Sequence, residues 1–397
     1  MLYQNLSPAP ADPILGLTDA FKKDSNPSKV NLGVGVYMDE KGRTPILKAV
    51  KQAEKILLDS QDTKSYLPIA GAPEYGQAVQ ELLFNSRESA RMRTAHTPGG
   101  TGALRVGADF LRKIRASATV WLSSPTWANH KGIFSAAGFK TAEYPYYDPA
   151  SHGIAFDRMR ECLKAIPEGD IVLLHVCCHN PTGVDLSPEQ WKDVIGIAQE
   201  RKWIPFLDFA YQGFGKGVEE DRAVLEPLLD AKLAFFVASS FSKNFGLYQE
   251  RVGALTLVAE TADAAEAAFS HVKTTIRVLY SNPSAHGGAI VTTIFRDPAL
   301  RSLWLSELNE MRGRIAAVRK EFVNQLKAKG ASMDFSFICR QNGMFSFSGL
   351  SDAQVSYLRE KKAIYMVAGG RMNVAGILPG NIGYLCESVA EALERAP

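Results

Sequence analysis

The chain is poor in cysteine, with five among its 397 residues, and they form no metal-binding or disulfide pattern. An odd number cannot all pair within one chain, and the adjacent Cys177 and Cys178 lack the CxxC spacing of a metal knuckle. We therefore expect reduced thiols, a cytoplasmic setting and no metal site.

Excess charge and long hydrophobic runs are also lacking. The formal net charge is +3, and lysine and arginine form no long block, which argues against a nucleic-acid partner. No apolar stretch reaches about 18 residues, and the opening MLYQNLSPAPADPILG combines no basic region with an apolar run. We expect a protein that is neither secreted nor membrane-spanning.

What the chain does contain is a regular alternation of apolar strands and amphipathic helices between residues 120 and 258. One helix is predicted to begin near Ser187, an N-cap residue followed by Pro188 at the first helical position. Such alternation is typical of a mostly parallel sheet with helices on both faces, and the length favours two domains. The predicted strands are Val120–Ser123, Ile171–Cys177, Trp203–Phe209, Ala234–Ser239 and Val252–Val258.

Polar and aromatic residues stand at the ends of four of these strands. Each has a structural explanation when taken alone: Trp127 could belong to the core, and Asp208 could be an ion-pair partner. Because α/β sheets bind ligands outside the carboxyl ends of their strands, we expect these side chains to converge on one edge. They are Trp127, Asn180, Asp208, Tyr211 and Lys243.

Lys243 lies in the stretch SSFSKNFG (239–246), directly after an apolar run that predicts a strand buried on both faces. Partial desolvation there disfavours the charged form of a lysine and leaves an amine nucleophile. Ser240 and Arg251 add a hydroxyl and a fixed cation, which suit a phosphate. Alone, a surface lysine at a strand end would be the more common case.

Two other segments are rich in glycine. The sequence TPGGTG (97–102) runs into a helical pattern, and a glycine-rich turn that opens a helix offers free N–H groups to a phosphate. A plain turn is equally compatible with it. Gly33 and Gly35 alternate in a second segment, which permits a close backbone approach or a tight bend. They complete no GxGxxG motif.

Outside this region, the chain ends predict a smaller α+β arrangement. Residues 299–329 keep a helical apolar pattern up to Gly330, and a helix of this length is expected to bridge two domains. Arg371 lies among small and apolar residues. The other expected elements are a helix around Ile14–Phe21, strands near Phe335–Cys339 and Met344–Phe347, and helices near Ala353–Lys361 and Asn381–Arg395.

Together these residues closely resemble one family, the class I, fold-type I aminotransferases that use pyridoxal phosphate. The nearest likeness is to its aspartate and aromatic branch, and it covers essentially the whole chain in order. The matching stretches are NLGVGVY (31–37), SYLPIAG (65–71), PGGTGALRVGADF (98–110), SPTWANH (124–130), HNPTG (179–183), DFAYQGF (208–214), SSFSKNFGLYQERVG (239–253), YSNPSAHG (280–287), NGMFSFSGL (342–350) and GRMNVAG (370–376).

The resemblance implies an α/β fold with a large domain and a small one. The large domain, residues 37–302, would be a three-layer αβα domain with a mostly parallel sheet that binds pyridoxal phosphate. The small α+β domain would come from both chain ends, residues 1–36 and 303–397, with the long helix 299–329 between the two.

The resemblance also implies roles around the cofactor ring. Lys243 would bond covalently to the cofactor and then carry a proton during the reaction. Asp208, supported by His130, would pair with the pyridine nitrogen and keep it protonated, which makes the ring an electron sink. Tyr211 and Asn180 would hydrogen-bond the ring's phenolic oxygen, and Trp127 would stack on the ring. The phosphate would be held by Gly100, Thr101, Ser240, Arg251 and, from a neighbouring subunit, Tyr66.

Substrate contacts follow from the same resemblance. Arg371 would bind the α-carboxylate, and Arg277, from the partner subunit, would bind a second carboxylate. Gly35, Trp127 and Asn180 would complete the substrate site. These residues imply small-molecule substrates, dicarboxylic amino acids and their 2-oxo acids, and a homodimer with shared active sites.

Two alternatives remain open, and a third is excluded. Tyr66-Leu67-Pro68-Ile69-Ala70-Gly71 resembles members with tyrosine or broad specificity, so an aromatic amino acid could be the main substrate. A non-catalytic homologue could store cofactor or bind a partner, although it would not need Lys243 and two carboxylate clamps. A dinucleotide dehydrogenase would need a glycine fingerprint and a ribose-binding acid that this chain lacks.

Overall fold

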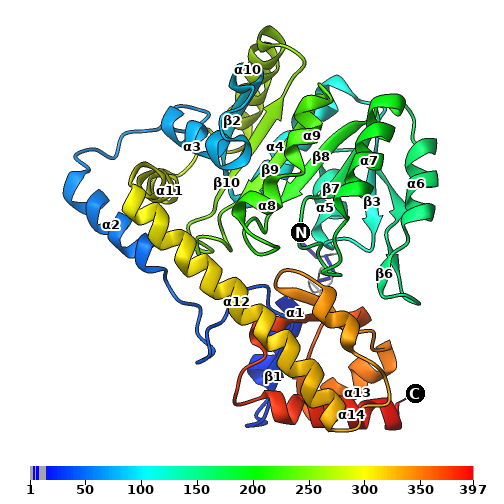
Figure 1. Cartoon of the computed structure of the whole chain (residues 1–397). Helices are drawn as coiled ribbons and strands as arrows, with labels where there is room; N and C mark the ends of the chain where they lie inside the picture. The colour runs from blue at the N-terminus through cyan, green and yellow to red at the C-terminus, as the bar shows by residue number, and fades with distance from the viewer. Residues whose placement is uncertain (1–2, 5, 9–14, 397) are drawn as a thin grey trace. The chain divides into compact units, whose positions relative to one another are not determined.

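The structure is a computed structural model that describes residues 3–4, 6–8 and 15–396. The chain divides into two compact units (Figure 1). Unit 1 takes its described residues from Met1–Arg43, Ile315–Arg340 and Met344–Pro397, and unit 2 consists of Thr44–Arg314 and Gln341–Gly343. These divisions fall later in the chain than the boundaries expected after residues 36 and 302.

Unit 2 is built on a seven-stranded sheet. Strand β10 runs antiparallel to both of its neighbours, β2 and β9, while the remaining pairs are parallel. The predicted α/β class with a mostly parallel sheet is therefore confirmed. In spatial order the strands are β2 (Met92–Pro98), β10 (Val252–Val258), β9 (Phe235–Ser240), β8 (Ile204–Phe209), β7 (Ile171–His175), β3 (Thr119–Ser124) and β4 (Lys140–Pro145).

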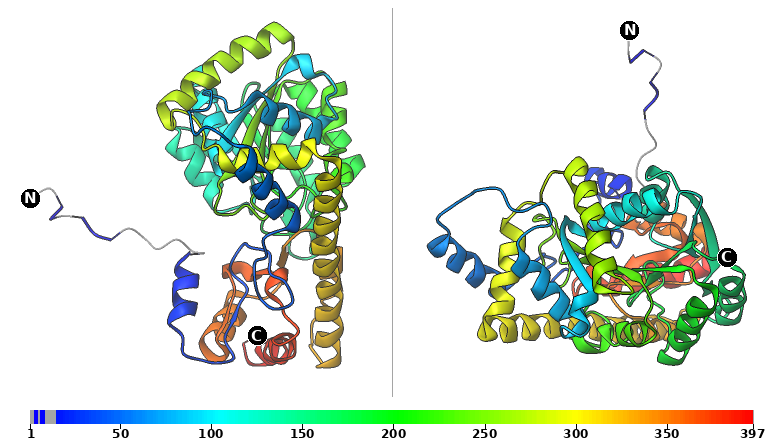
Figure 2. Two further views of the ribbon diagram at one scale, coloured as in Figure 1. Left: turned by 90° about the vertical axis from the view of Figure 1, so that its left-hand side faces the viewer. Right: turned by 90° about the horizontal axis from the view of Figure 1, so that it is seen from above.

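Helices cover both faces of this sheet (Figure 1). Helices α4, α5 and α10 pack on one face, and α3, α7, α8 and α9 lie over the other. The helices of unit 2 are α2 (Lys48–Ser60), α3 (Pro73–Phe84), α4 (Gly99–Ile114), α5 (Asn129–Ala136), α6 (Phe156–Ala165), α7 (Pro188–Arg201), α8 (Val218–Arg222), α9 (Leu225–Asp230), α10 (Ala262–Leu279) and α11 (His286–Arg296), with a 3-10 turn η1 (Ser89–Arg91) and a small hairpin of β5 (Tyr147–Asp148) and β6 (Gly153–Ile154). Figure 2 shows the extended loop that links α2 to α3.

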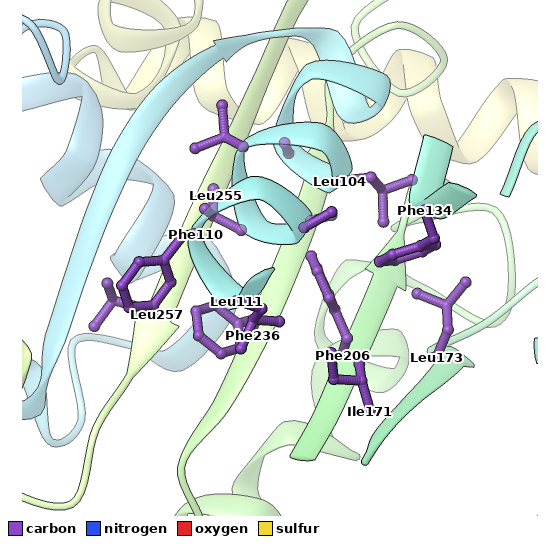
Figure 3. Packing of buried hydrophobic residues seen from close by; sticks show 14 of the residues in the cluster. Leu104, Phe110, Leu111, Phe134, Ile171, Leu173, Phe206, Phe236, Leu255 and Leu257 are labelled. Carbon is purple, nitrogen blue, oxygen red and sulfur yellow. The ribbon is translucent and has the colours of Figure 1, made fainter. Parts of the chain in front are cut away.

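The main core of unit 2 lies between α4 and the sheet (Figure 3). Leu104 and Leu111 of α4 recur at helical spacing and meet alternate strand residues, among them Phe206 and Phe236. A Cβ at Gly107 would fall 2.5 Å from Phe206 Cζ, so glycine lets the helix approach the sheet closely here. This packing fixes the edge of the sheet from which the candidate site is built.

Helix starts follow local sequence chemistry. Ser187 caps α7, as its sequence predicted, and accepts from the Gln190 backbone N–H. The Gln190 side chain completes a capping box, which was not predicted. The prediction at residues 97–102 needs correction: the strand ends at Pro98 and α4 begins at Gly99, so the glycines form the first turn of the helix rather than a turn before it. Gly99 has φ +71°, which allows the chain to pass abruptly from strand to helix.

Unit 1 contains two small sheets from distant parts of the chain. β1 (Val30–Asn31) pairs in parallel with β12 (Ile364–Tyr365), and β11 (Phe345–Phe347) pairs antiparallel with β13 (Arg371–Asn373). The helices α1 (Leu15–Lys23), α13 (Asp352–Lys362) and α14 (Ile382–Arg395) and the 3-10 turns η3 (Ala368–Gly370) and η4 (Val374–Gly376) complete it. Ile14 lies outside the described residues.

One predicted strand in unit 1 is wrong. The segment near Phe335–Cys339 forms a 3-10 helix, η2 (Ser336–Arg340). Asp334 accepts from the Ser336 amide at 2.9 Å and from its hydroxyl at 2.7 Å, which starts a helical turn. Phe337 and Ile338 of this turn are buried in the hydrophobic core of unit 1. The segment is therefore apolar because it contributes to the core, although it is not a strand.

The long helix α12 (Pro298–Ala328) has 31 residues (Figure 2). Its residues up to Arg314 belong to unit 2, and those from Ile315 onward belong to unit 1. It ends where predicted, because Gly330 takes φ +76° and the Ala331 amide closes back on the Leu326 carbonyl at 3.1 Å. Across the described residues, no helix combines the length and the apolar character needed to cross a bilayer.

Candidate active site

The carboxyl ends of β7, β8 and β9 bring the predicted side chains of unit 2 to one edge. Asp208 on β8 lies in register with His175 on β7 and Ala238 on β9. Lys243 follows the end of β9, and its Nζ lies 4.6 Å from the centroid of the Tyr211 ring. An acid, an amine and a phenol therefore share one site.

Asp208 is held by His130 of α5. His130 Nε2 lies 2.9 Å from Asp208 Oδ2, and the two side chains are 0% and 11% exposed. Burial alone would raise the pKa of Asp208, but the hydrogen bond and charge of His130, helped by His175 and Lys243, hold it below its usual value. Asp208 is therefore an anion at neutral pH.

A chain of hydrogen bonds extends behind this pair. The backbone N–H of Asn180 donates to His175 Nδ1 at 3.2 Å, so the proton of His175 lies on Nε2. His175 Nε2 in turn donates to Thr126 Oγ1 at 3.2 Å. Thr126 Oγ1 then donates to His130 Nδ1 at 2.8 Å, and His130 Nε2 donates to Asp208. Burial lowers the pKa of His175 to about 3, with His130 adding to the effect and Asp208 opposing it, which keeps His175 neutral.

Lys243 has the perturbed amine that the sequence predicted. Burial lowers its pKa from the ordinary 10.5 to about 8, the positive charge of Arg251 acts in the same direction, and Asp208 opposes both. A substantial neutral fraction near pH 8 makes this amine a usable base or nucleophile.

The phosphate-binding candidates also meet. A Cβ at Gly99 would fall 2.5 Å from Arg251 Nη2, and one at Gly100 would fall 3.1 Å from Ser240 Cβ. Only glycine leaves room at this point, where the first turn of α4 faces a hydroxyl and a guanidinium. Thr101 occupies the same helical turn. Arg251 is exposed and donates to Ser242 Oγ at 3.3 Å, so its charge remains open to a ligand.

Asn180 and Trp127 border the same cluster. Asn180 is buried at 6% exposure, next to the hydrogen-bonded His175. Trp127 is half-buried, and its ring lies 5.1 Å from that of His130 in an edge-to-face arrangement. Its indole can therefore provide an apolar wall without breaking the Asp208–His130 contact.

Two predicted substrate residues lie in unit 1. Arg371 is buried, donates from Nη2 to the Gly33 carbonyl at 2.7 Å, and places its guanidinium carbon 4.3 Å from the Phe345 ring centroid. A Cβ at Gly35 would fall 3.2 Å from Phe345 Cζ, so the backbone there lies against the same ring. Unit 1 thus brings Arg371 and the Gly33–Gly35 segment together.

Tyr66 and Arg277 are not brought to this cluster. Tyr66 is 92% exposed in the loop before α3, and Arg277 is exposed near the end of α10, where it hydrogen-bonds Ser281. Both side chains face away from the core of their own unit and are available to another molecule.

The residues of unit 2 fit pyridoxal phosphate. Asp208 Oδ1 accepts no hydrogen bond from the described residues, so one carboxylate oxygen remains for a protonated pyridine nitrogen. The glycines, Ser240 and Arg251 form a cradle that any Cβ would fill, and it suits a phosphate. Lys243 supplies the amine.

Two residues of the hydrogen-bond chain were not predicted, Thr126 and His175. His175 carries a signal that the sequence offers, a polar residue at the last position of a buried strand. Thr126 carries none, because its role depends on lying between two imidazole rings from different elements.

Comparison with known proteins gives consistent results. The family described as Aminotransferase class I and II matches residues 27–389. The chain is 52% identical to an aspartate aminotransferase of Escherichia coli K12, over 99% of this chain and 100% of the relative, and 43% identical to the aromatic-amino-acid aminotransferase of the same organism, with the same coverage. The crystal structure of a Burkholderia pseudomallei aromatic-amino-acid aminotransferase covalently bound to pyridoxal phosphate is 48% identical, covers 99% of this chain and 100% of its own, and superposes with a TM-score of 0.96.

Proposed function

We propose, since this chain belongs to the family of class I and II aminotransferases, that it transfers an amino group reversibly between aspartate and 2-oxoglutarate and also accepts aromatic amino acids. The observation that carries the proposal is the Lys243 amine, with a pKa of about 8, beside the Asp208–His130 pair. Aspartate is proposed as the main substrate because the aspartate aminotransferase of E. coli shares 52% identity with the chain.

Pyridoxal phosphate is the cofactor, and when bound it supplies the electron sink that stabilises negative charge at the substrate α-carbon. Lys243 would attach it and, as a neutral amine, would accept the proton that leaves the α-carbon. Asp208 Oδ1 would hold the proton on the pyridine nitrogen, and His130 keeps the carboxylate ionised and oriented.

The other residues of unit 2 would bind and orient. Tyr211 and Asn180 would hydrogen-bond the phenolic oxygen of the ring, and Trp127 would cover one face of it. Gly100, Thr101, Ser240 and Arg251 would hold the phosphate, with Tyr66 from a second subunit. The charge-assisted hydrogen bonds from Arg251 to the phosphate would be the strongest of these contacts. They would hold the cofactor in place during the reaction.

Two arginines would select the substrate. Arg371 would bind the α-carboxylate common to all amino acids, with its guanidinium already held by Gly33 and Phe345. Arg277 from a second subunit would bind the side-chain carboxylate of aspartate or glutamate. Gly35, Trp127 and Asn180 would be the other residues that contact the substrate.

A homodimer follows from these assignments, because Tyr66 and Arg277 would complete the site of the other subunit. The exposure of both side chains supports this arrangement. A cytoplasmic location is proposed from the five cysteines, none of which forms a disulfide in the described structure. Sedimentation and cell fractionation would test the two proposals separately.

Aromatic transamination as the main activity is the second candidate. The Burkholderia aromatic-amino-acid aminotransferase, at 48% identity and a TM-score of 0.96, favours it. Relative kcat/KM values for aspartate and phenylalanine decide between the two candidates.

The first experiment is visible absorption of the purified protein. A cofactor band that changes on addition of aspartate and returns with 2-oxoglutarate is the expected result, since it reports both half-reactions. A protein that takes up no pyridoxal phosphate would overturn the proposal, and one that binds it without responding to any amino acid would be a non-catalytic homologue.

A further inference from the structure

The loop that follows Tyr211 is wrapped around one buried carboxylate. Asp221 of α8 is 7% exposed and accepts four backbone hydrogen bonds from this loop. Its Oδ2 accepts from the amides of Gly213 at 2.8 Å and Gly215 at 3.0 Å, and its Oδ1 from those of Lys216 at 2.8 Å and Gly217 at 3.5 Å. Both oxygens are therefore used, and every partner is main chain.

No cation of the described chain forms an ion pair with this carboxylate, whose surroundings are those of a backbone anion nest. Burial raises the pKa of Asp221, and the four amide hydrogen bonds oppose the rise. A buried carboxylate is costly unless it is well hydrogen-bonded, so the amides must stay in place around it. The four hydrogen bonds therefore fix both the conformation of the loop and the position of the Asp221 carboxylate.

The loop has little freedom on its other sides. A Cβ at Gly215 would fall 2.4 Å from Asp221 Oδ1, and one at Gly213 would fall 2.4 Å from Leu308 Cδ2. Gly213 takes φ +93°, and its carbonyl accepts from Arg312 at 3.1 Å. Glycine at both positions allows a closer wrapping than any side chain would.

This loop begins at the residue whose ring lies beside the reactive amine. The Tyr211 carbonyl accepts from the Phe214 amide at 3.0 Å, and the next residue, Gln212, is buried and donates to the carbonyls of Leu82 and Val218. Because this tight turn connects Tyr211 to the loop, a displacement of the loop would also displace Tyr211. The Tyr211 ring is the group 4.6 Å from Lys243 Nζ.

We infer that Asp221 is a positioning residue that fixes Tyr211 for its contact with the cofactor. The inference rests on the proposed function, since it concerns the hydrogen bond that the Tyr211 hydroxyl would make. Asp221 touches neither substrate nor cofactor, and it acts through the amides of residues 213–217.

Asp221→Asn tests it, because the amide keeps the shape but replaces one acceptor oxygen with a donor that faces backbone N–H groups. The matched control is Glu220→Gln on the same helix, an exposed residue. Each is also combined with Tyr211→Phe. The measurements are amide hydrogen exchange of residues 213–217 in the cofactor-free protein, the Kd for pyridoxal phosphate, and the pH titration of the absorbance of the bound cofactor.

Asp221→Asn should speed exchange in the loop, weaken cofactor binding by about 3- to 10-fold, the size of one lost hydrogen bond, and shift the titration in the same direction as Tyr211→Phe. In the Tyr211→Phe background it should add no further shift, because both changes remove the same interaction. Glu220→Gln should behave as the wild type.

An Asp221→Asn protein that is only less stable, with unchanged cofactor affinity and titration, would overturn the inference, as would additive effects in the double variant. Wild-type protein that binds no cofactor would overturn the proposed function and this inference together. If Asp221→Asn fails to fold, Gly215→Ala crowds the same carboxylate from the loop side, and the same two outcomes decide.

Discussion

Asp208 Oδ2 and His130 Nε2 lie 2.9 Å apart, and behind His130 the hydrogen bonds continue through Thr126 and His175 to the amide of Asn180. Every link pairs a donor with an acceptor. The carboxylate is thereby oriented from the rear, while its second oxygen stays open. These hydrogen bonds also connect Asp208 to the backbone N–H of Asn180.

Interrupting this series of hydrogen bonds should weaken catalysis without unfolding the protein. Thr126→Val removes the hydroxyl between the two imidazoles at little cost in volume. We expect kcat/KM for aspartate to fall by about 3- to 10-fold, the effect of one lost hydrogen bond. Steady-state kinetics measure it, with Thr119→Val on β3 as the control. Equal kinetics in the two variants would show that the chain is not needed to orient Asp208.

Removing the amine should have a far larger effect. Lys243→Ala eliminates the proposed base, so turnover with aspartate should fall by at least about 10²- to 10⁴-fold. The exposed Lys202→Ala should leave turnover unchanged. Single-turnover absorbance changes measure both, and an active Lys243→Ala protein would assign the proton transfer to another residue.

The lowered pKa of Lys243 predicts a pH-dependent stability of the cofactor-free protein. Its pKa is about 8 in the folded state and about 10.5 when unfolded, so the unfolded chain binds more protons between these values. The charged lysine therefore destabilises the fold fully below about pH 8, and this penalty fades as pH rises towards 10.5.

Lys243→Met should accordingly raise the free energy of unfolding at pH 7 by about 1–3 kcal/mol, less than the shift alone would give because a side chain can relax. The difference from wild type should shrink above pH 8. Urea unfolding at several pH values measures it, with Lys202→Met as the control. A constant difference across this range would contradict the shifted pKa.

Two arginine variants should affect the activity with aspartate and the activity with phenylalanine differently. Arg371→Ala should reduce kcat/KM for aspartate and phenylalanine alike, by about 10- to 100-fold, because both carry an α-carboxylate. Arg277→Ala should do so for aspartate only. Kinetics with both amino acids measure the pattern. A loss of phenylalanine activity equal to that of aspartate in Arg277→Ala would remove Arg277 from the role of side-chain selector.

Shared sites predict complementation between inactive subunits. In a mixed dimer of Lys243→Ala and Arg277→Ala chains, one site carries both changes and the other carries neither. Refolding the two variants together at equal amounts should restore about one quarter of the wild-type aspartate activity, by statistical pairing. Activity equal to the sum of the separate variants would show that each chain uses its own Arg277.

Much of the fold was accessible from sequence because its signals are local. The five predicted strands and the start of α7 depend on apolar runs and cap residues within a few positions. The sequence does not predict β2, because this strand carries polar residues that are hydrogen-bonded only in the folded protein, such as Thr94, whose hydroxyl lies 2.9 Å from that of Thr256. The apolar pattern at Ser336–Arg340 predicts a strand wrongly, because a buried 3-10 helix and a short strand share the same apolar composition.

The site divides in the same way. Asp208 and Lys243 were found because strand ends meet at one edge of a parallel sheet. Thr126 and Asp221 were not predicted, because their roles depend on where their side chains point in the folded protein. His175 was not predicted either, although it is a polar residue at the last position of a buried strand. A carboxylate that serves four backbone amides looks, in sequence, like any acidic residue in a surface helix.

The pairing of Val30 with Ile364 has a consequence for how this protein is made. All seven strands of the large sheet have been synthesised by Val258, whereas β1 must wait for more than three hundred further residues before its partner strand exists. Contacts this distant in the chain close slowly, and domains fold as units during synthesis. We therefore expect the cofactor-binding sheet to form while the chain is still on the ribosome, with the first strand of the protein among the last parts to be ordered.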